Sequence, residues 1–353
     1  MLKIFSFFLL LVGFFGGCDE DSEPPAVARG RVHYETYCAL CHGGKGEGYL
    51  SPRANALNNP DFLRSASDPF LYTAVTQGRP GTKMSPFGQD FAGPLSDSMV
   101  KDLIAFMRYW DKSPPQTLSD DPVAGDVEQG ASLYEQHCVL CHGANAEGKN
   151  AMSLNNPVFL ASASDGFLEY GIRKGRRATP MLAYETVLSS EEIGHLVAFL
   201  RSLERPVDYE PPRGNSEECS ELKIFGSQSN GAPPWQVEGP LHESNLSVFN
   251  AYDEGREMVL LDARPKGDYL WGHIDGAMSM PYYDVEKCYS ALPRDTWIVT
   301  YCACPHNESE HAANVLKEQG FDKVRVLNEG YIEWKEAGYP VTEPDSSEDS
   351  GGD

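Results

Sequence analysis

The chain has 353 residues, which is too long for one hydrophobic core and favours two or three domains. It carries 52 acidic and 29 basic residues, a formal net charge of -23. A phosphate polymer would be repelled by this charge, which argues against nucleic acid as a partner, whereas a basic protein partner suits it.

The N-terminal residues 1–17 have the pattern of an export signal. Lys3 precedes an apolar run that is too short to span a bilayer, and two glycines stand before Cys18. The segment resembles a bacterial lipoprotein signal, which implies a lipidated Cys18 and a membrane anchor; a plain cleaved signal is the alternative. Asp19 resembles a signal for inner-membrane retention. We therefore expect an exported protein that is lipid-anchored on the periplasmic face of a bacterial membrane, with the inner membrane as the expected site.

The strongest pattern is an internal repeat of a Cys-x-x-Cys-His motif. Residues 34–42 (YETYCALCH) recur as residues 134–142 (YEQHCVLCH). Two thiols on one helical turn can add to the vinyl groups of haem, while the adjacent histidine ligates the iron. A zinc half-site or a redox dithiol would explain one copy, but two copies with histidine in an exported chain favour haem. The predicted ligands of two covalent haem c groups are Cys38, Cys41 and His42, and Cys138, Cys141 and His142.

The repeat also indicates the sixth ligand of each haem iron. The loop 78–84 (GRPGTKM) recurs as 175–181 (GRRATPM), and each copy ends on a methionine. Thioether ligation suits haem iron and raises its reduction potential. Met84 and Met181 are therefore predicted iron ligands. The alternative is a five-coordinate iron that binds a small molecule.

Residues without a counterpart in the repeat are predicted to be structural. Met107 aligns with Leu200, so we expect it to lie in the core. His195 aligns with Asp102 and is expected at the surface.

The repeat predicts two domains, 28–112 and 126–205, joined by a Pro-, Ser- and Asp-containing linker at 113–125. Apolar residues at helical spacing over 95–110 and 188–203 predict a C-terminal helix in each. A Gly-x-x-x-Tyr lead-in, the haem motif, the methionine loop and this helix follow in the order that resembles class I cytochrome c domains. The resemblance implies small all-α folds with His/Met-ligated haem.

The pattern changes after a Pro-rich linker at 206–240. A third domain, 241–343, is predicted to be α/β with a parallel sheet, and the acidic tail 344–353 is expected to be disordered. The predicted elements are strands at 258–262, 297–301 and 324–327 and a helix at 308–319.

The motifs LDAR, GHIDGA, YC and GYIEW, in this order along the third domain, resemble the rhodanese family. The resemblance implies that Cys302 is a nucleophile that carries a persulfide, in a loop whose backbone N–H groups converge at a helix N-terminus. The loop has no arginine, and Glu308 and Glu310 bring negative charge that would raise the pKa of the thiol. Cys304 is a candidate resolving thiol. The sequence leaves open whether Cys219 and Cys288 form a disulfide.

Three functions remain. The first is a membrane-tethered di-haem cytochrome that exchanges electrons with redox partners of the respiratory chain and handles sulfane sulfur, taken from a donor, on Cys302. In the second, the rhodanese-like domain is a non-catalytic docking or redox-sensing module. The third, a haem sensor or oxidase subunit, needs an open iron position, and the two matched methionine loops count against it.

Overall fold

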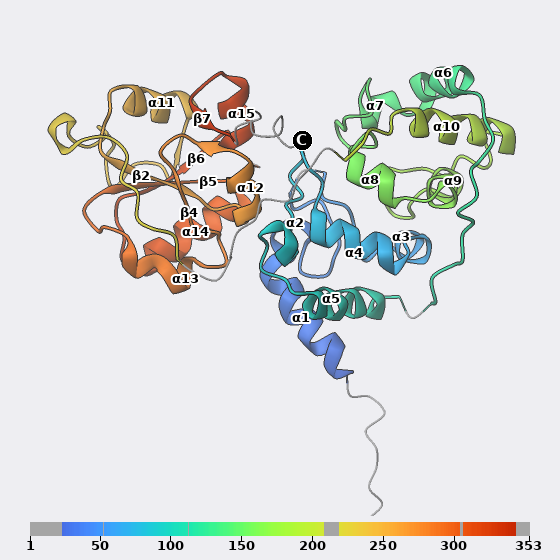
Figure 1. The fold of residues 1–353 in the computed structure, drawn as a ribbon, viewed down its shortest axis with the longest axis horizontal. Helices are drawn as coiled ribbons and strands as arrows, with labels where there is room; N and C mark the ends of the chain where they lie inside the picture. Colours follow the sequence, from blue (N-terminus) through green and yellow to red (C-terminus); the bar gives the residue numbers. More distant parts are fainter. Residues whose placement is uncertain (1–22, 52, 112, 208–218, 304–305, 344–353) are drawn as a thin grey trace, which may run out of the picture.

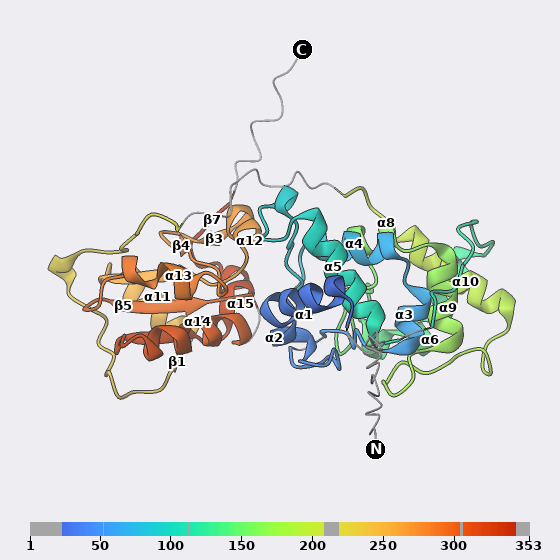
Figure 2. The ribbon, with the colours of Figure 1, turned by 90° about the horizontal axis from the view of Figure 1, so that it is seen from below.

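The computed structural model describes residues 23–51, 53–111, 113–207, 219–303 and 306–343. Two all-helical units are followed by an α/β unit, which confirms the predicted fold class (Figure 1). The first helical unit lies between the other two (Figures 1 and 2). Cys18, Cys304 and the acidic tail fall outside the described residues. Within the described residues, no helix is both long and apolar enough to cross a membrane.

The two helical units contain the same series of helices. The first has α1 (Pro25–Tyr37), α2 (Ala39–His42), α3 (Pro60–Ser65), α4 (Asp68–Gln77), η1 (Gln89–Phe91) and α5 (Asp97–Tyr109). The second has α6 (Val127–His137), α7 (Val139–His142), α8 (Pro157–Ser162), α9 (Asp165–Lys174) and α10 (Ser190–Ser202). Repeated caps explain the repeated helices, because side chains accept backbone N–H groups at matching N-termini. These caps are Asn59, Ser67 and Ser96, and Asn156, Ser164 and Ser189.

Each helical unit is closed by a tight crossing of its first and last helices. A Cβ atom on Gly30 would lie 1.9 Å from the carbonyl oxygen of Asp102, and one on Gly130 would lie 2.0 Å from that of His195. Only glycine therefore permits the approach of α1 to α5 and of α6 to α10. Met107 is buried in the core, as predicted.

The surface prediction for His195 is wrong. The side chain is only 8 % exposed, and its Nδ1 accepts a hydrogen bond of 2.8 Å from the backbone N–H of Asp126. Asp126 is the N-cap of α6, so the imidazole holds the start of this helix against α10. Its aligned counterpart, Asp102, pairs instead with Arg29, and the repeat alone could not reveal this difference.

The α/β unit is built on a five-stranded parallel sheet in the order β1-β6-β5-β2-β4. Its strands are β1 (His242–Glu243), β2 (Met258–Asp262), β4 (Met278–Ser279), β5 (Trp297–Tyr301) and β6 (Val324–Leu327), and β3 (His273–Ile274) pairs antiparallel with β7 (Val341–Thr342). Its helices are α11 (Asn245–Asp253), α12 (Lys266–Trp271), α13 (Val285–Cys288), α14 (Asn307–Glu318) and α15 (Gly330–Glu336), with η2 (Gln228–Asn230) and η3 (Tyr289–Ala291). The three predicted strands and the long helix are confirmed, the helix shifted by one residue.

The segment before β1 packs on the α/β unit. Cys219 and Cys288 form a disulfide, with a Cα–Cα distance of 5.6 Å, which answers the question left open by the sequence. Phe225 exchanges backbone hydrogen bonds with Met258 of β2, and the ring of Trp235 meets that of Trp297 edge to face. Much of the Pro-rich stretch is therefore bound to the sheet.

Candidate haem sites and the Cys302 loop

Each predicted haem-ligating histidine is presented by a four-residue helix. His42 and His142 are both buried, and burial lowers the pKa of each, so both rings are neutral at pH 7. The Nδ1 of His42 lies 2.9 Å from the carbonyl oxygen of Asn55, and that of His142 lies 2.9 Å from the carbonyl oxygen of Met152. A carbonyl only accepts, so Nδ1 carries the proton and Nε2 keeps its lone pair for iron.

The cysteines of the two motifs do not resemble redox dithiols. Burial raises the pKa of the Cys38 thiol to about 12, and burial followed by the charge of Cys141 raises that of Cys138 to about 11. A reactive dithiol needs the opposite shift, because the thiolate is the nucleophile. The environment therefore fits uncharged thioether bonds better than a redox or zinc-binding pair.

A buried tyrosine fixes each motif to the loop that follows it. Tyr34 donates a hydrogen bond of 2.7 Å to the carbonyl oxygen of Gly43, and Tyr134 donates one of 2.8 Å to that of Gly143. Both glycines have positive φ, 83° and 87°, which lets the chain turn away directly after the histidine. The tyrosine of each Gly-x-x-x-Tyr segment thus fixes the helical turn that carries the histidine to the loop that follows it.

The two methionine loops have the same hydrogen bonds. The carbonyl oxygens of Met84 and Met181 accept from the backbone of Arg79 (2.7 Å) and Arg176 (2.9 Å). A threonine hydroxyl accepts from each methionine N–H at 3.2 Å. Both methionines are half-buried. This equivalence supports assigning them the same role, and their ligation to iron stays a prediction.

The arginines of these loops suit a group that carries carboxylates. Burial lowers the pKa of Arg79 to about 10 and that of Arg176 to about 10. Each donates to a carbonyl of its own loop at 3.0 Å, Gly78 and Gly175, and neither has a carboxylate within 4.0 Å among the described residues. A buried guanidinium without an anion is costly, and the propionates of haem would supply one. The donor set and these cations therefore fit haem.

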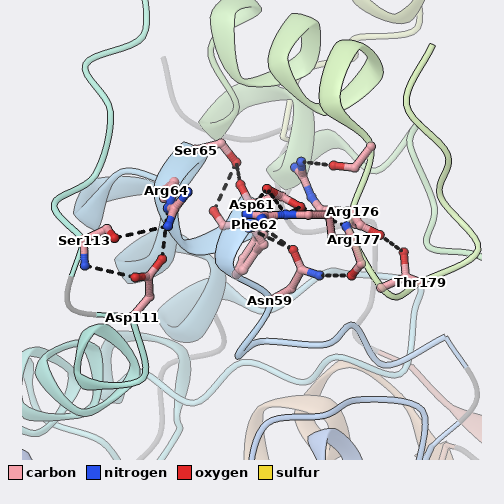
Figure 3. Close-up of polar contacts among 11 residues, drawn as sticks. Asn59, Asp61, Phe62, Arg64, Ser65, Asp111, Ser113, Arg176, Arg177 and Thr179 are labelled. Atoms are coloured by element: carbon pink, nitrogen blue, oxygen red, sulfur yellow. Dashed lines mark hydrogen bonds and ion pairs between the residues drawn. The ribbon is translucent and has the colours of Figure 1, made fainter. Parts of the chain in front are cut away.

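The two helical units contact each other through reciprocal hydrogen bonds. The side-chain amide of Asn59 donates 2.8 Å to the carbonyl oxygen of Arg177, and that of Asn156 donates 2.8 Å to the carbonyl oxygen of Pro80. Asp61 accepts from the backbone of Arg177 at 2.9 Å and pairs with its guanidinium (Figure 3). Since these positions are equivalent in the repeat, the units pack about an approximate two-fold axis with both methionine loops at their interface.

Aromatic rings complete this interface. Phe70 of α4 and Phe167 of α9, equivalent residues, have ring centroids 4.6 Å apart, and Phe159 lies 6.1 Å from Phe70. The guanidinium of Arg79 lies over the Phe70 ring at 5.4 Å. The interface is therefore apolar at its centre, with polar contacts around it.

In the α/β unit, Cys302 follows β5 and precedes the loop that leads into α14. Its side chain is 1 % exposed, and its Sγ lies 3.3 Å from the hydroxyl oxygen of Ser309. Glu308 is buried beside it. Burial, and then the charge of Cys302, raise the pKa of Glu308 well above its ordinary value, which favours the neutral form of this carboxyl.

The two glutamates that were expected to bring negative charge to the thiol lie in different environments. Burial favours the neutral form of Glu308, whereas Glu310 accepts a hydrogen bond from Nε2 of His242 at 2.7 Å. The buried cation of this region, Arg264, is bound by Asp262 through Nε at 2.9 Å and is covered by the ring of Tyr331 at 4.1 Å. The LDAR motif thus forms an internal ion pair.

The α/β unit docks on the first haem motif. Tyr282 donates a hydrogen bond of 3.0 Å to the carbonyl oxygen of Tyr37, and Asn307 donates to that of Leu40. Leu40 packs against the core of the α/β unit, and α14 lies beside α2 (Figures 1 and 2). Burial raises the pKa of Tyr282 well above its ordinary value. Tyr282 therefore lies between the Cys302 loop and the first haem motif.

The equivalent surface of the second helical unit is open. Leu140, which corresponds to Leu40, is 74 % exposed. Leu182, which corresponds to the buried Ser85, is 68 % exposed, and nearby in sequence Val187 is 63 % exposed. One haem motif is thus covered by the α/β unit, and the other presents apolar side chains to solvent.

Comparison with known families gives the class of each part. The family described as cytochrome C oxidase, cbb3-type, subunit III matches residues 25–107 and 125–200. The rhodanese-like domain family matches residues 247–337. The chain therefore consists of helical cytochrome c domains of the cbb3 type and a C-terminal rhodanese-like α/β domain, and cytochrome c domains imply covalently bound haem c.

Individual relatives match separate parts of the chain. The cbb3-type cytochrome c oxidase subunit CcoP of Azospirillum sp. (strain B510) is 26 % identical over 203 residues, which cover 52 % of this chain and 64 % of that protein. Subunit FixP of Bradyrhizobium sp. (strain ORS 278) is 29 % identical, with the same coverage of 52 % and 64 %. Among solved structures, the rhodanese-like domain of the Anabaena sp. Alr3790 protein is 29 % identical, with a TM-score of 0.29, covering 33 % of this chain and 88 % of that domain.

Proposed function

We propose that this chain is a di-haem electron-transfer protein whose rhodanese-like domain handles sulfane sulfur on Cys302. Cys38, Cys41, His42 and Met84 would hold one haem, and Cys138, Cys141, His142 and Met181 the other. Haem, when bound, supplies one-electron redox chemistry. The observation that carries the proposal is the docking of the α/β unit on the first haem motif, through Asn307 at the start of α14, Leu40 and Tyr282, close to the Cys302 loop.

The proposed sulfur step transfers one sulfur atom from a donor to the Cys302 thiolate. The Cys302 thiolate attacks the outer sulfur of a donor such as thiosulfate, forming the persulfide Cys302–S–S⁻ as the bond to sulfite breaks and sulfite leaves. Ser309 lies next to the sulfur, and the raised pKa of Glu308 favours its neutral form, which reduces like-charge repulsion with the anionic persulfide. Formation of the persulfide transfers no electrons, so haem reduction would need a second step. In that step the persulfide would join the released sulfite, Cys302–S–S⁻ + SO₃²⁻ → Cys302–S–S–SO₃⁻ + 2 e⁻, and each of the two bound haems would accept one electron. The contact of α14, which follows the Cys302 loop, with α2 supports this proposed coupling.

The open surface around Leu140 and Leu182 is the proposed contact with a redox partner protein. The relatives named above are oxidase subunits, so a respiratory terminal oxidase is the partner class we propose. Lipid attachment through Cys18, on the periplasmic face of a membrane, belongs to the same proposal. We also propose that the rhodanese-like domain begins near Cys219, because the disulfide and Phe225 bind that segment to it.

A second candidate function is a docking module without turnover. It is favoured by the burial of Cys302 and by the contact of Asn307, at the start of α14, with the first cytochrome unit. Anaerobic mixing of the oxidised protein with thiosulfate or polysulfide separates the two. Coupled sulfur chemistry predicts haem reduction in the native protein and its loss in Cys302→Ser. Equal haem reduction in both proteins, or none in either, would favour the docking module.

A further inference from the structure

Three side chains of metal-ligating types meet at the N-terminal end of α14, and none of them belongs to a haem motif. His242, His306 and Glu310 each offer one ligand atom, and these atoms all lie within 4.8 Å of one another. His242 comes from β1, while the other two belong to the start of α14. The ring centroids of the two histidines are 4.4 Å apart. Two secondary-structure elements thus bring one carboxylate and two imidazoles to one point.

His306 is held in an unusual conformation. It has a φ of 78°, in the left-handed region that residues other than glycine rarely adopt. Its Nδ1 is buried and has no hydrogen-bond partner among the residues that the structure describes. A strained backbone and an unpaired ring nitrogen both cost free energy, so hydrogen bonding between described residues does not account for this placement.

We propose that His242, His306 and Glu310 bind a Zn²⁺ ion. Two imidazoles and one carboxylate are ligands that zinc accepts, and three protein ligands leave the fourth position to water. With metal–ligand bonds of about 2.0–2.2 Å, tetrahedral ligand atoms lie roughly 3.4 Å apart. The contact of 2.7 Å between His242 and Glu310 would therefore open slightly as the ion replaces the shared proton. Both side chains are partly exposed, which gives an ion access from solvent.

The surroundings place this zinc site at the junction of two units. Lys83, which precedes Met84, is near enough for its charge to act on His306. Glu329 also acts on His306, but its carboxylate is engaged by the backbone N–H of Asn245 at 2.6 Å. His306 follows the loop that starts at Cys302, so the ion would fasten this loop to β1. Zinc binding is independent of whether Cys302 carries a persulfide.

Calorimetric titration of the untagged holoprotein with ZnCl₂ tests the site. We expect one ion to bind per chain, and His242→Gln and Glu310→Gln each to weaken binding by more than about a hundredfold, since loss of even an outer-shell partner costs 10–100-fold. The control is His311→Gln, an exposed histidine next to Glu310, which should bind like the native protein. With Cu²⁺ as a probe, electron paramagnetic resonance should show coupling to two imidazole nitrogens in the native protein and one in His242→Gln.

The opposite results would overturn the zinc site. Absence of Zn²⁺ binding by the native holoprotein would do so, as would unchanged binding in both His242→Gln and Glu310→Gln. Binding that is lost in Cys302→Ser but kept in His242→Gln would move the ion to the thiol. Circular dichroism of each variant shows whether lost binding reflects lost folding. If only one of His242→Gln and Glu310→Gln folds, Zn²⁺ binding by that variant decides whether the site exists.

Discussion

Leu40 and Leu140 occupy the same position between the two cysteines of their haem motifs, yet Leu40 packs against the rhodanese-like core and Leu140 is 74 % exposed. The repeat makes these residues a matched pair for mutagenesis. Leu40→Asp would place a charge against an apolar core, which costs several kcal/mol unless the domains separate. We expect Leu40→Asp to increase the radius of gyration measured by small-angle X-ray scattering and Leu140→Asp to leave it unchanged. Unchanged scattering in both variants would show that the docked arrangement does not persist in solution.

The exposed apolar surface of the second unit should control electron exchange with a protein partner. Replacing Leu140 and Leu182 together by glutamine removes apolar contact area without changing the charge. Loss of two central contacts typically costs about 1–3 kcal/mol, so we expect the second-order rate of electron exchange with a basic c-type cytochrome to fall by about tenfold or more. Stopped-flow absorbance measures this rate. Val32→Gln, an equally apolar exposed site on α1, is the control; an equal loss there would show that the effect is not local.

The contact between the cytochrome units should weaken in acid. Burial acts to raise the pKa of Asp61, but hydrogen bonds and charge from Arg177 outweigh it and hold the pKa below its ordinary value of 3.8. A carboxyl whose pKa is lower in the folded than in the unfolded protein stabilises the fold at pH values above the unfolded-state pKa. This stabilisation is lost as the pH falls through the folded-state pKa. Asp61→Asn should cost about 1–2 kcal/mol at pH 7 and should make stability less dependent on pH below 3.8.

Thermal unfolding at several pH values measures the effect of Asp61. Asp120→Asn, at an exposed linker position, should unfold like the native protein throughout. If Asp61→Asn matched the native protein at pH 7, the ion pair with Arg177 would contribute nothing to the interface.

Local features of the fold could be predicted from the sequence, while contacts between units could not. The strand runs at 258–262, 297–301 and 324–327 are mostly apolar and buried throughout, so their type and limits followed from composition. The helical turn that carries each haem-ligating histidine could be predicted from the repeated Cys-x-x-Cys-His motif. The raised pKa of Glu308 and the burial of Leu40 depend on packing between segments far apart in the chain, which periodicity does not encode. The approximate two-fold axis is of the same kind, since it depends on the hydrogen bonds that Asn59 and Asn156 make to the other unit.

The methionine loops give a prediction about iron coordination. Because the loops of Met84 and Met181 share their backbone hydrogen bonds, we expect each methionine to ligate one iron. Each Met→Ala change should remove about half of the near-infrared charge-transfer absorbance of the oxidised protein and lower the potential of one haem, because a soft thioether favours the reduced iron. The control is Met107→Leu in the core, which should keep the full band. A full band in Met84→Ala would refute its assignment.

The last prediction concerns the chemistry of Cys302. Its sulfur lies beside the hydroxyl of Ser309, at the start of a helix whose N-terminal dipole favours an anion. Because burial favours the neutral form of Glu308, we expect Glu308→Gln to change the rate of persulfide formation by less than about twofold, whereas an ionised Glu308 would make the variant clearly faster. After incubation with thiosulfate, mass spectrometry should show a gain of one sulfur atom in the native protein and in Glu308→Gln, but none in Cys302→Ser. A native protein that gains no sulfur, or a Cys302→Ser variant that gains as much, would leave the rhodanese-like domain as a docking module with a buried cysteine.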